Sequence, residues 1–309
     1  MISVIVCTWN RSDVLLRCLQ SLEAQTLARE LYEVVVVDND STDDTPSVVA
    51  GFAARLSMNV RYVRETRQGL SHARNAGIEA AGGDLLAFID DDCIAETGFL
   101  AALISVFEET GAGLVAGKVT SVPPEGLVTD LPRGFDMSRK LAHLDLGAER
   151  RPMLAHEYAL GCNLAVRKSL AHEVGGFSPD LGYAGESKMV GEDTEFCARV
   201  ALTGALLVWE PRAAVVHCVG PERFAKAAYR KAAYCYGQGS LMRRLGKGPS
   251  AMRRARAAGR SILQALLGGL AWLLVCWSPR LRFKVELKIA SALGKLGAAL
   301  NRRGGDAYR

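Results

Sequence analysis

Two kinds of apolar pattern alternate along the first 220 residues of the chain. Unbroken β-branched runs, such as Val34 to Val37, are typical of strands buried on both faces of a sheet. Between these runs, apolar residues recur every three or four positions, as from Val14 to Leu22, which is typical of helices packed against a sheet. The predicted strands are 2–8, 33–38, 60–63, 85–89, 113–122, 159–167, 206–209 and 213–218. The predicted helices are 11–25, one capped within 41–44 and ending near Leu56, 70–81, 99–109, 168–174 and 191–203.

This alternation predicts an α/β fold of Rossmann-like type, with a mostly parallel sheet and helices on both faces. The pattern becomes irregular at 123–152, where four prolines lie among residues of mixed polarity. We expect a long loop or a mobile flap in that stretch.

Charge divides the chain near Glu222. Residues 1–222 carry 19 Lys and Arg against 31 Asp and Glu, whereas the remainder carries 19 against 2. We therefore predict two domains, an α/β domain over 1–220 and a basic, partly apolar helical region over 221–309 that associates with a membrane.

The C-terminal region joins a basic helical stretch, 223–244, to the apolar run 262–277, in which only Gln264 is polar. This run has 16 residues, about 24 Å as a helix, which is fewer than the ~20 residues that span a bilayer comfortably. Because arginines flank it on both sides, we expect an in-plane or re-entrant helix at an anionic leaflet, followed by an amphipathic helix over 281–300. The alternatives are a packed helical pair in a soluble protein and a homodimer interface. A nucleic-acid-binding tail is disfavoured by the long apolar run.

The eight cysteines are scattered singly and form no CxxC pair, which indicates buried free thiols in a reducing compartment. The chain starts at Met1 with a strand pattern instead of a charged leader and a long apolar stretch, so we expect no Sec-type secretion. These features predict a peripheral or monotopic protein at the cytoplasmic face of the inner membrane.

Polar side chains follow the predicted strands at the edge where open α/β sheets bind their ligands. Asp90, Asp91 and Asp92 come directly after a buried strand, and their mutual repulsion favours a bound cation. A hard divalent ion such as Mg²⁺ or Mn²⁺ takes oxygen ligands from carboxylates and from substrate phosphate. The alternative is a solvated acidic turn.

Other strand ends and helix starts carry further candidates. Asp38 and the segment 8–11 follow two strands, although Asn and Asp also cap turns. Arg74 lies in a basic stretch beside Gly69 at a helix start, which suits either a diphosphate or a plain helical surface. Acids at 192–193 begin a helix, where they complement its dipole or serve as a general base. His217 ends a strand and suits a structural role or a metal.

Six stretches, in this order and spacing, resemble glycosyltransferase family 2, whose catalytic domain has the GT-A fold. They are Val4–Arg11, Val37–Asp43, Gly69–Gly77, Asp90–Asp92, Gly175–Phe177 and Gly191–Asp193. The resemblance covers roughly residues 1–220. It implies an enzyme that binds a nucleotide diphosphate sugar, with UDP-hexose as the default, together with Mg²⁺ or Mn²⁺.

The resemblance assigns a role to each candidate. Asp92 is the direct metal ligand in the family's DxD element, and His217 adds a further metal contact. Base and ribose contacts fall to Thr8, Asn10, Arg11 and Asp38. Arg74 lies near the ribose or diphosphate, and Asp90 or Asp91 lies nearer the ribose. The acceptor pocket is built by Gly161, Asn163 and Glu192.

By the same resemblance Asp193 is the catalytic base. It takes the proton from an acceptor hydroxyl, which attacks the anomeric carbon from the face opposite the leaving group and inverts the configuration. The Gln-x-x-Arg-Trp motif that accompanies processive polymerases is absent after Asp193, so we expect transfer of a single sugar to a lipid-linked or polysaccharide acceptor. One alternative is a catalytically inactive GT-A scaffold tethered to a membrane, which the intact acids disfavour. Another is a sugar nucleotidyltransferase, which would need a glycine-rich phosphate loop in place of Cys7–Asn10.

Overall fold

The computed structural model describes residues 1–55, 59–135, 142–184, 187–189, 191–245, 249–275 and 277–300. The chain forms two compact units. Unit 1 comprises Met1–Val122, Ala142–Pro179 and Glu192–Val219, and unit 2 comprises Pro123–Leu141, Asp180–Gly191 and Gly220–Arg309. The functional division of the chain at residue 220 stays a prediction. The expected helix end at Leu56 and the residues 136–141 of the expected loop lie outside the described residues.

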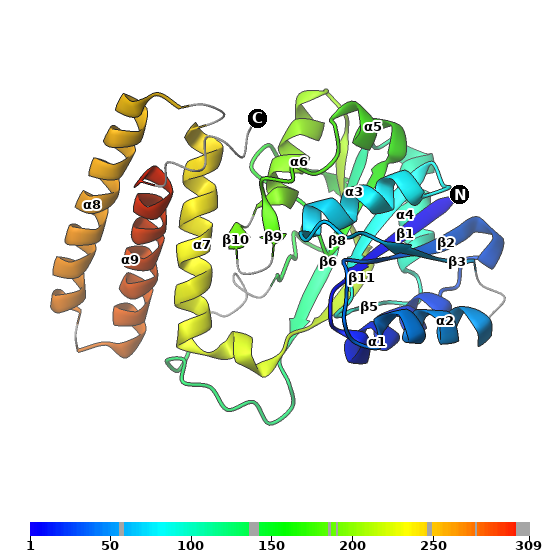
Figure 1. Ribbon diagram of the computed structural model, residues 1–309, viewed down its shortest axis with the longest axis horizontal. Coiled ribbons are helices and arrows are strands. Elements are labelled where there is room, and N and C mark those ends of the chain that lie inside the picture. The colour runs from blue at the N-terminus through cyan, green and yellow to red at the C-terminus, as the bar shows by residue number, and fades with distance from the viewer. Residues whose placement is uncertain are drawn as a thin grey trace. The chain divides into compact units, whose positions relative to one another are not determined.

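In the described part of unit 1, nine strands form one sheet in the order β3-β2-β1-β4-β8-β6-β11-β5, with β7 beside β11 (Figure 1). Neighbours among β1 to β4 are parallel, β8 runs antiparallel between β4 and β6, and β6 is parallel to β11. β5 and β7 pair antiparallel with β11, so the sheet is mixed, with a wholly parallel part from β3 to β4. The strands are β1 Ile2–Thr8, β2 Tyr32–Asp38, β3 Val60–Arg64, β4 Leu85–Asp90, β5 Cys93–Ala95, β6 Leu114–Val122, β7 Arg151–Pro152, β8 Asn163–Arg167 and β11 Leu207–Cys218.

Helices cover both faces of this sheet because successive strand residues point to opposite sides. Val4 and Val6 of β1 share one apolar cluster with Leu15 of α1, whereas Ile5 belongs to a second cluster with Phe196 of α6. Gly77 of α3 is needed for close packing, since a Cβ there would collide with the Ile5 side chain. The helices of unit 1 are α1 Ser12–Glu23, the 3-10 turn η1 Arg29–Leu31, α2 Thr45–Arg55, α3 Leu70–Ala80, α4 Phe99–Thr110, α5 Lys168–Glu173 and α6 Glu192–Leu202.

The structure corrects three sequence predictions in unit 1. The two strands expected at 206–209 and 213–218 are one strand, β11, whose register with β6 shifts between Glu210 and Ala214. Pro211, which has no N–H to donate, lies within that irregularity. The strand expected from residue 159 begins at Asn163. The short strand β5 was not predicted, because three residues are too few for a recognisable pattern.

Unit 2 contains three long helices that lie side by side, with α9 packed against both α7 and α8 (Figure 1). Glycines allow this approach, because a Cβ on Gly294 of α9 would collide with the Tyr234 carbonyl of α7. The expected helix over the apolar run begins earlier than predicted, because α8 starts at Ala251 in the basic residues before that run. The elements of unit 2 are β9 Gly182–Ala184, β10 Ser187–Met189, the 3-10 turn η3 Pro221–Phe224, α7 Lys226–Leu245, α8 Ala251–Leu274 and α9 Pro279–Leu300.

The helix α8 directs its small side chains inward and its leucines outward. Ser261 is buried, and Gly268 lies against Ile289 of α9. Within the described residues, α8 is the one helix that is both long and apolar enough to cross a bilayer, judged on length and composition. The leucines exposed along it are Leu263, Leu266, Leu267, Leu270, Leu273 and Leu274.

Candidate active site

The carboxyl ends of the strands in unit 1 bring the predicted site residues to one edge of the sheet. Register pairs Thr8 of β1 with Asp38 of β2, and Cys7 with Asp90 of β4. At the far side of the sheet, β5 follows β4 in the chain and pairs antiparallel with β11, which sets His217 opposite Cys93. Residues 8, 38, 90 and 217 are thus placed by strand ends alone.

Asp91 is held by two residues from the end of β1. Its Oδ2 accepts a hydrogen bond from Thr8 Oγ1 at 2.8 Å, and its Oδ1 is 2.7 Å from Arg11 Nη1. Burial raises the pKa of Asp91 to about 7, with Arg11 opposing and Asp92 adding to the shift. Thr8, Arg11 and Asp91 therefore form one polar cluster, and their nucleotide contacts stay predictions.

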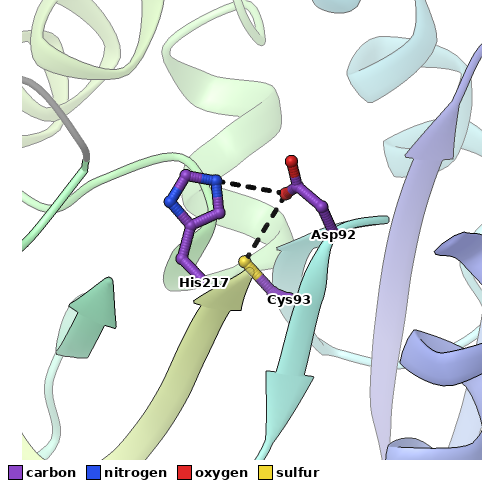
Figure 2. Close-up of side chains that lie close together, drawn as sticks. All are labelled: Asp92, Cys93 and His217. Atoms are coloured by element: carbon purple, nitrogen blue, oxygen red, sulfur yellow. Dashed lines mark hydrogen bonds and ion pairs between the residues drawn. The ribbon is translucent and has the colours of Figure 1, made fainter. Parts of the chain in front are cut away.

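Asp92 joins this cluster to β11. Its Oδ2 is 2.8 Å from Arg11 Nη2, and its Oδ1 is 3.3 Å from Nε2 of His217, which is also buried (Figure 2). Burial by itself would raise the pKa of Asp92, but His217 and Arg11 outweigh burial and lower it. The Sγ atom of Cys93 lies 3.9 Å from the same Oδ1.

Arg74 of α3 connects the acids of β4 with those of α6. Its guanidinium is 3.3 Å from Asp90 Oδ1 and 2.9 Å from Glu192 Oε1, and its side chain is only 3% exposed. The guanidinium also lies over the Phe177 ring, with Cζ 5.2 Å from the ring centroid. Gly161 passes so close that a Cβ there would collide with the guanidinium. Packing on all these sides fixes Arg74 between the two carboxylates.

Asp193 occupies the first turn of α6, beside Glu192. Its Oδ2 accepts a hydrogen bond from the Gly161 amide at 3.1 Å, and its Oδ1 accepts one from the Thr194 amide at 2.6 Å. Burial raises the pKa of Glu192, and the Asp193 charge raises it further against the opposing effect of Arg74. The predicted base therefore has a defined orientation.

Asp38 and Asn10 have partners of their own on the β1 and β2 side. Asp38 is buried and accepts hydrogen bonds from the Ser41 amide at 2.8 Å and from the Tyr62 hydroxyl at 2.7 Å. Asn10 has φ of 52° and accepts the Thr42 amide at 2.7 Å. These bonds hold together the two loops that follow β1 and β2. The predicted base and ribose contacts of Asp38 and Asn10 stay predictions.

Asn163, at the start of β8, lies inside the sheet. It is 1% exposed, and its Nδ2 donates to the carbonyls of Lys118 at 2.9 Å and Ala213 at 2.8 Å. Among the described residues, its Oδ1 has no hydrogen-bond partner. These bonds tie β8 to β6 and β11. Its acceptor role stays a prediction.

Residues 3–175 match the family model described as Glycosyl transferase family 2. The chain belongs to glycosyltransferase family 2. The sequence resemblance and the predicted GT-A fold class are thereby confirmed, and the helices of unit 2 confirm the C-terminal helical segment.

Three relatives illustrate the match to family 2. Glycosyltransferase AglE of Haloferax volcanii is 30% identical over 185 residues, which are 60% of this chain and 58% of AglE. The glucosyl-dolichyl phosphate glucuronosyltransferase of the same organism is 26% identical over 223 residues, covering 70% of this chain and 68% of that protein. Among solved structures, the mannosyltransferase PcManGT of Pyrobaculum calidifontis, in complex with GDP-Man and Mn²⁺, has a TM-score of 0.59 at 22% identity, over 99% of this chain and 77% of PcManGT. The chain thus spans little more than half of AglE.

Three residues of this family 2 site escaped the sequence analysis. Tyr62 donates to Asp38 from the neighbouring strand β3, and the buried Asn39 accepts the Gly69 amide at 2.8 Å, which fixes the loop before α3. Cys93 was counted only among scattered buried thiols. Its position directly after three aspartates was the available indication that it borders the candidate metal site.

Proposed function

We propose that this family 2 chain transfers a single sugar, with inversion, from a nucleoside diphosphate sugar to a lipid-linked or glycan acceptor at the cytoplasmic face of a membrane. The observation that carries the proposal is the contact of Arg74 with both Asp90 and Glu192. Arg74 thereby links the carboxylates at the end of β4, which suit binding of the donor, to the start of α6. The predicted base, Asp193, follows Glu192 there. The names of the relatives support donor and acceptor classes of this kind, since they specify GDP-Man with Mn²⁺ and a glucosyl-dolichyl phosphate.

A divalent cation fits the residues at the end of β4. Asp92 offers a carboxylate oxygen and His217 an imidazole nitrogen, both within a cluster of buried potential ligands. Arg11 compensates only part of the charge on Asp91 and Asp92. When bound, a divalent ion supplies positive charge that stabilises the departing nucleoside diphosphate.

The chain's own residues prepare the acceptor for attack. Asp193 takes the proton of the acceptor hydroxyl, and the amides of Gly161 and Thr194 hold its carboxylate in place. Glu192 is engaged by Arg74 and leaves Asp193 as the base. A single displacement from the face opposite the nucleotide then inverts the anomeric centre, so an α-linked donor gives a β-linked product.

The exposed face of α8 supports membrane association. A leucine side chain removed from water contributes about 1.5–3 kcal/mol, so the exposed leucines favour an apolar surrounding. The N-terminal half of the same helix carries four arginines, which suit anionic headgroups. We propose that α8 lies in the membrane plane, with basic and apolar halves in succession along one helix.

The test is a donor panel with the full chain in detergent, Mn²⁺ or Mg²⁺, and membrane lipid extract as acceptor. We expect one nucleotide sugar to yield a glycosylated product, and the anomeric configuration of that product to be opposite to that of the donor. A product that retains the configuration would contradict the inverting mechanism. No transfer and no nucleotide release from any donor would overturn the proposed activity.

A further inference from the structure

A cysteine lies among the candidate metal ligands. Asp92, Cys93 and His217 each offer one ligand atom, and these three atoms all lie within 4.8 Å of one another (Figure 2). All three side chains are buried, with Cys93 fully so. A carboxylate oxygen, an imidazole nitrogen and a thiol sulfur thus converge on one small volume.

Backbone pairing fixes this convergence. Cys93 and His217 are register partners across the antiparallel pair β5 and β11, and the Cys218 amide donates to the Asp92 carbonyl at 2.9 Å. A second thiol, Cys162, interacts with the Cys93 side chain from the turn before β8. The three donors therefore belong to a rigid part of the sheet and need little rearrangement to face one ion.

We propose that Cys93 is a sulfur ligand of the cation held by Asp92 and His217, and that it makes this site prefer thiophilic ions such as Zn²⁺ and Cd²⁺. The inference rests on the proposed metal site and adds a ligand to it. Thiolate and imidazole together favour zinc-like ions, whereas Mg²⁺ and Mn²⁺ favour oxygen ligands. On binding, the Cys93 S–H bond is replaced by a sulfur–metal bond, and the proton leaves to solvent without any change of oxidation state. Zn²⁺ should therefore displace Mn²⁺ from the site and inhibit transfer.

The experiment is a titration of the full chain with Co²⁺, Cd²⁺ and Mn²⁺ in the absence of donor. We expect Co²⁺ to produce a thiolate charge-transfer band that Cys93→Ser abolishes. The same variant should weaken Cd²⁺ binding by roughly 10–100-fold and Mn²⁺ binding by far less, because serine keeps the size and an oxygen donor while removing the sulfur. Cys235→Ser, which changes a buried thiol of α7, serves as the matched control and should alter neither metal.

The inference is wrong if wild-type protein gives no charge-transfer band, if the band persists in Cys93→Ser, or if both metals lose affinity equally. Should Cys93→Ser fail to fold, Asp92→Asn decides, because it leaves every thiol in place. If the band of Asp92→Asn depends on Co²⁺ concentration as in the wild type, the thiolate belongs to another site and the inference is overturned. If Asp92→Asn needs more Co²⁺ to develop the band, the inference is supported. These spectra do not require transfer, so an absent band with intact Mn²⁺-dependent transfer overturns only the role of Cys93. Metal binding without transfer from any donor overturns only the proposed activity.

Discussion

The strand-end edge of unit 1 and the outer face of α8 in unit 2 depart from ordinary protein structure in opposite ways. The first buries carboxylates, with Asp91 and Asp92 4% and 6% exposed, and the second exposes apolar side chains, with Leu266 63% exposed. Buried charge favours a counterion, and exposed leucines favour an apolar phase. Under the proposed function the two regions take different ligands: the strand-end edge takes a divalent cation with the donor, and the outer face of α8 takes a membrane.

A buried acid of unit 1 outside the site has two guanidinium partners. Glu210 of β11 is fully buried, but Arg150 lies 2.5 Å and Arg212 2.9 Å from its two oxygens. The Glu210 carboxylate is thus matched by two guanidiniums. At the site, one guanidinium, that of Arg11, is shared between Asp91 and Asp92, and Asp92 also lies 3.3 Å from Nε2 of His217.

The largest effect is expected from Asp193→Asn. The amide still accepts the Gly161 hydrogen bond but cannot take a proton, so kcat should fall by roughly 10²–10⁴ while the KM for the donor stays close to that of the wild type. Steady-state kinetics with the identified donor check this. A variant with wild-type kcat would remove Asp193 from the reaction.

Arg74→Leu should destabilise unit 1 by about 3–5 kcal/mol, because it leaves the buried Glu192 without its guanidinium partner. Urea denaturation measures the loss, and adding Glu192→Gln to the same chain should restore part of it. Arg64→Leu is the matched control. Its guanidinium pairs with Asp40 where both side chains are partly or largely exposed, so its removal should change the free energy of unfolding far less than Arg74→Leu does.
If the destabilisations caused by Arg74→Leu and Glu192→Gln simply added in the double variant, the proposed pairing of Arg74 with Glu192 would be contradicted.

Replacing Leu266 and Leu270 by serine should lower partitioning onto anionic vesicles by roughly tenfold or more, since each buried leucine contributes about 1.5–3 kcal/mol. Leu202→Ser changes a leucine of α6 in unit 1 that is more exposed than Leu266 and Leu270, and it should leave vesicle binding unaltered. Vesicle co-sedimentation at fixed ionic strength measures the difference. Equal binding by all three proteins would favour a soluble helical pair or a homodimer interface for α8.

The smallest effect is expected from a change at Glu210, the buried acid that two arginines pair. Burial would raise the pKa of Glu210, but Arg212 and Arg150 outweigh burial and lower it. The resulting stabilisation is present at neutral pH and is lost as the pH falls below the ordinary glutamate pKa of about 4.3. Glu210→Gln should therefore reduce the free energy of unfolding by about 1–3 kcal/mol at pH 7 and by less at pH 4. Urea denaturation at both pH values checks this, and a cost that grows on acidification would refute the ion pairs.

Local pattern predicted most of the sheet because β-branched runs such as Val34 to Val37 leave little choice of structure. It also predicted which residues end the strands, and hence much of the candidate site. It did not predict that Arg11 pairs with Asp91, because that contact depends on β1 lying beside β4, a choice made by packing over a separation of 80 residues.

Local pattern is less informative where the pairing of a short strand or the orientation of a helix decides which side chains meet. Cys93 reaches His217 only because β5 turns back to pair with β11, and three residues carry too little pattern to reveal that pairing. The direction of the α8 leucines depends on which side α9 covers, since Gly268 and Ser261 permit close approach on one side alone. Periodicity shows that a face is apolar, and packing decides whether that face is buried.

The most direct test of the central claim is nucleotide release from the identified donor by the full chain after treatment with a chelator. We predict that release falls to the uncatalysed level, returns when Mn²⁺ is added back, and stays low in Asp92→Asn at the same Mn²⁺ concentration. Release that continues unchanged in the chelator, or that Asp92→Asn performs as well as the wild type, would contradict a metal-dependent transferase centred on Asp92.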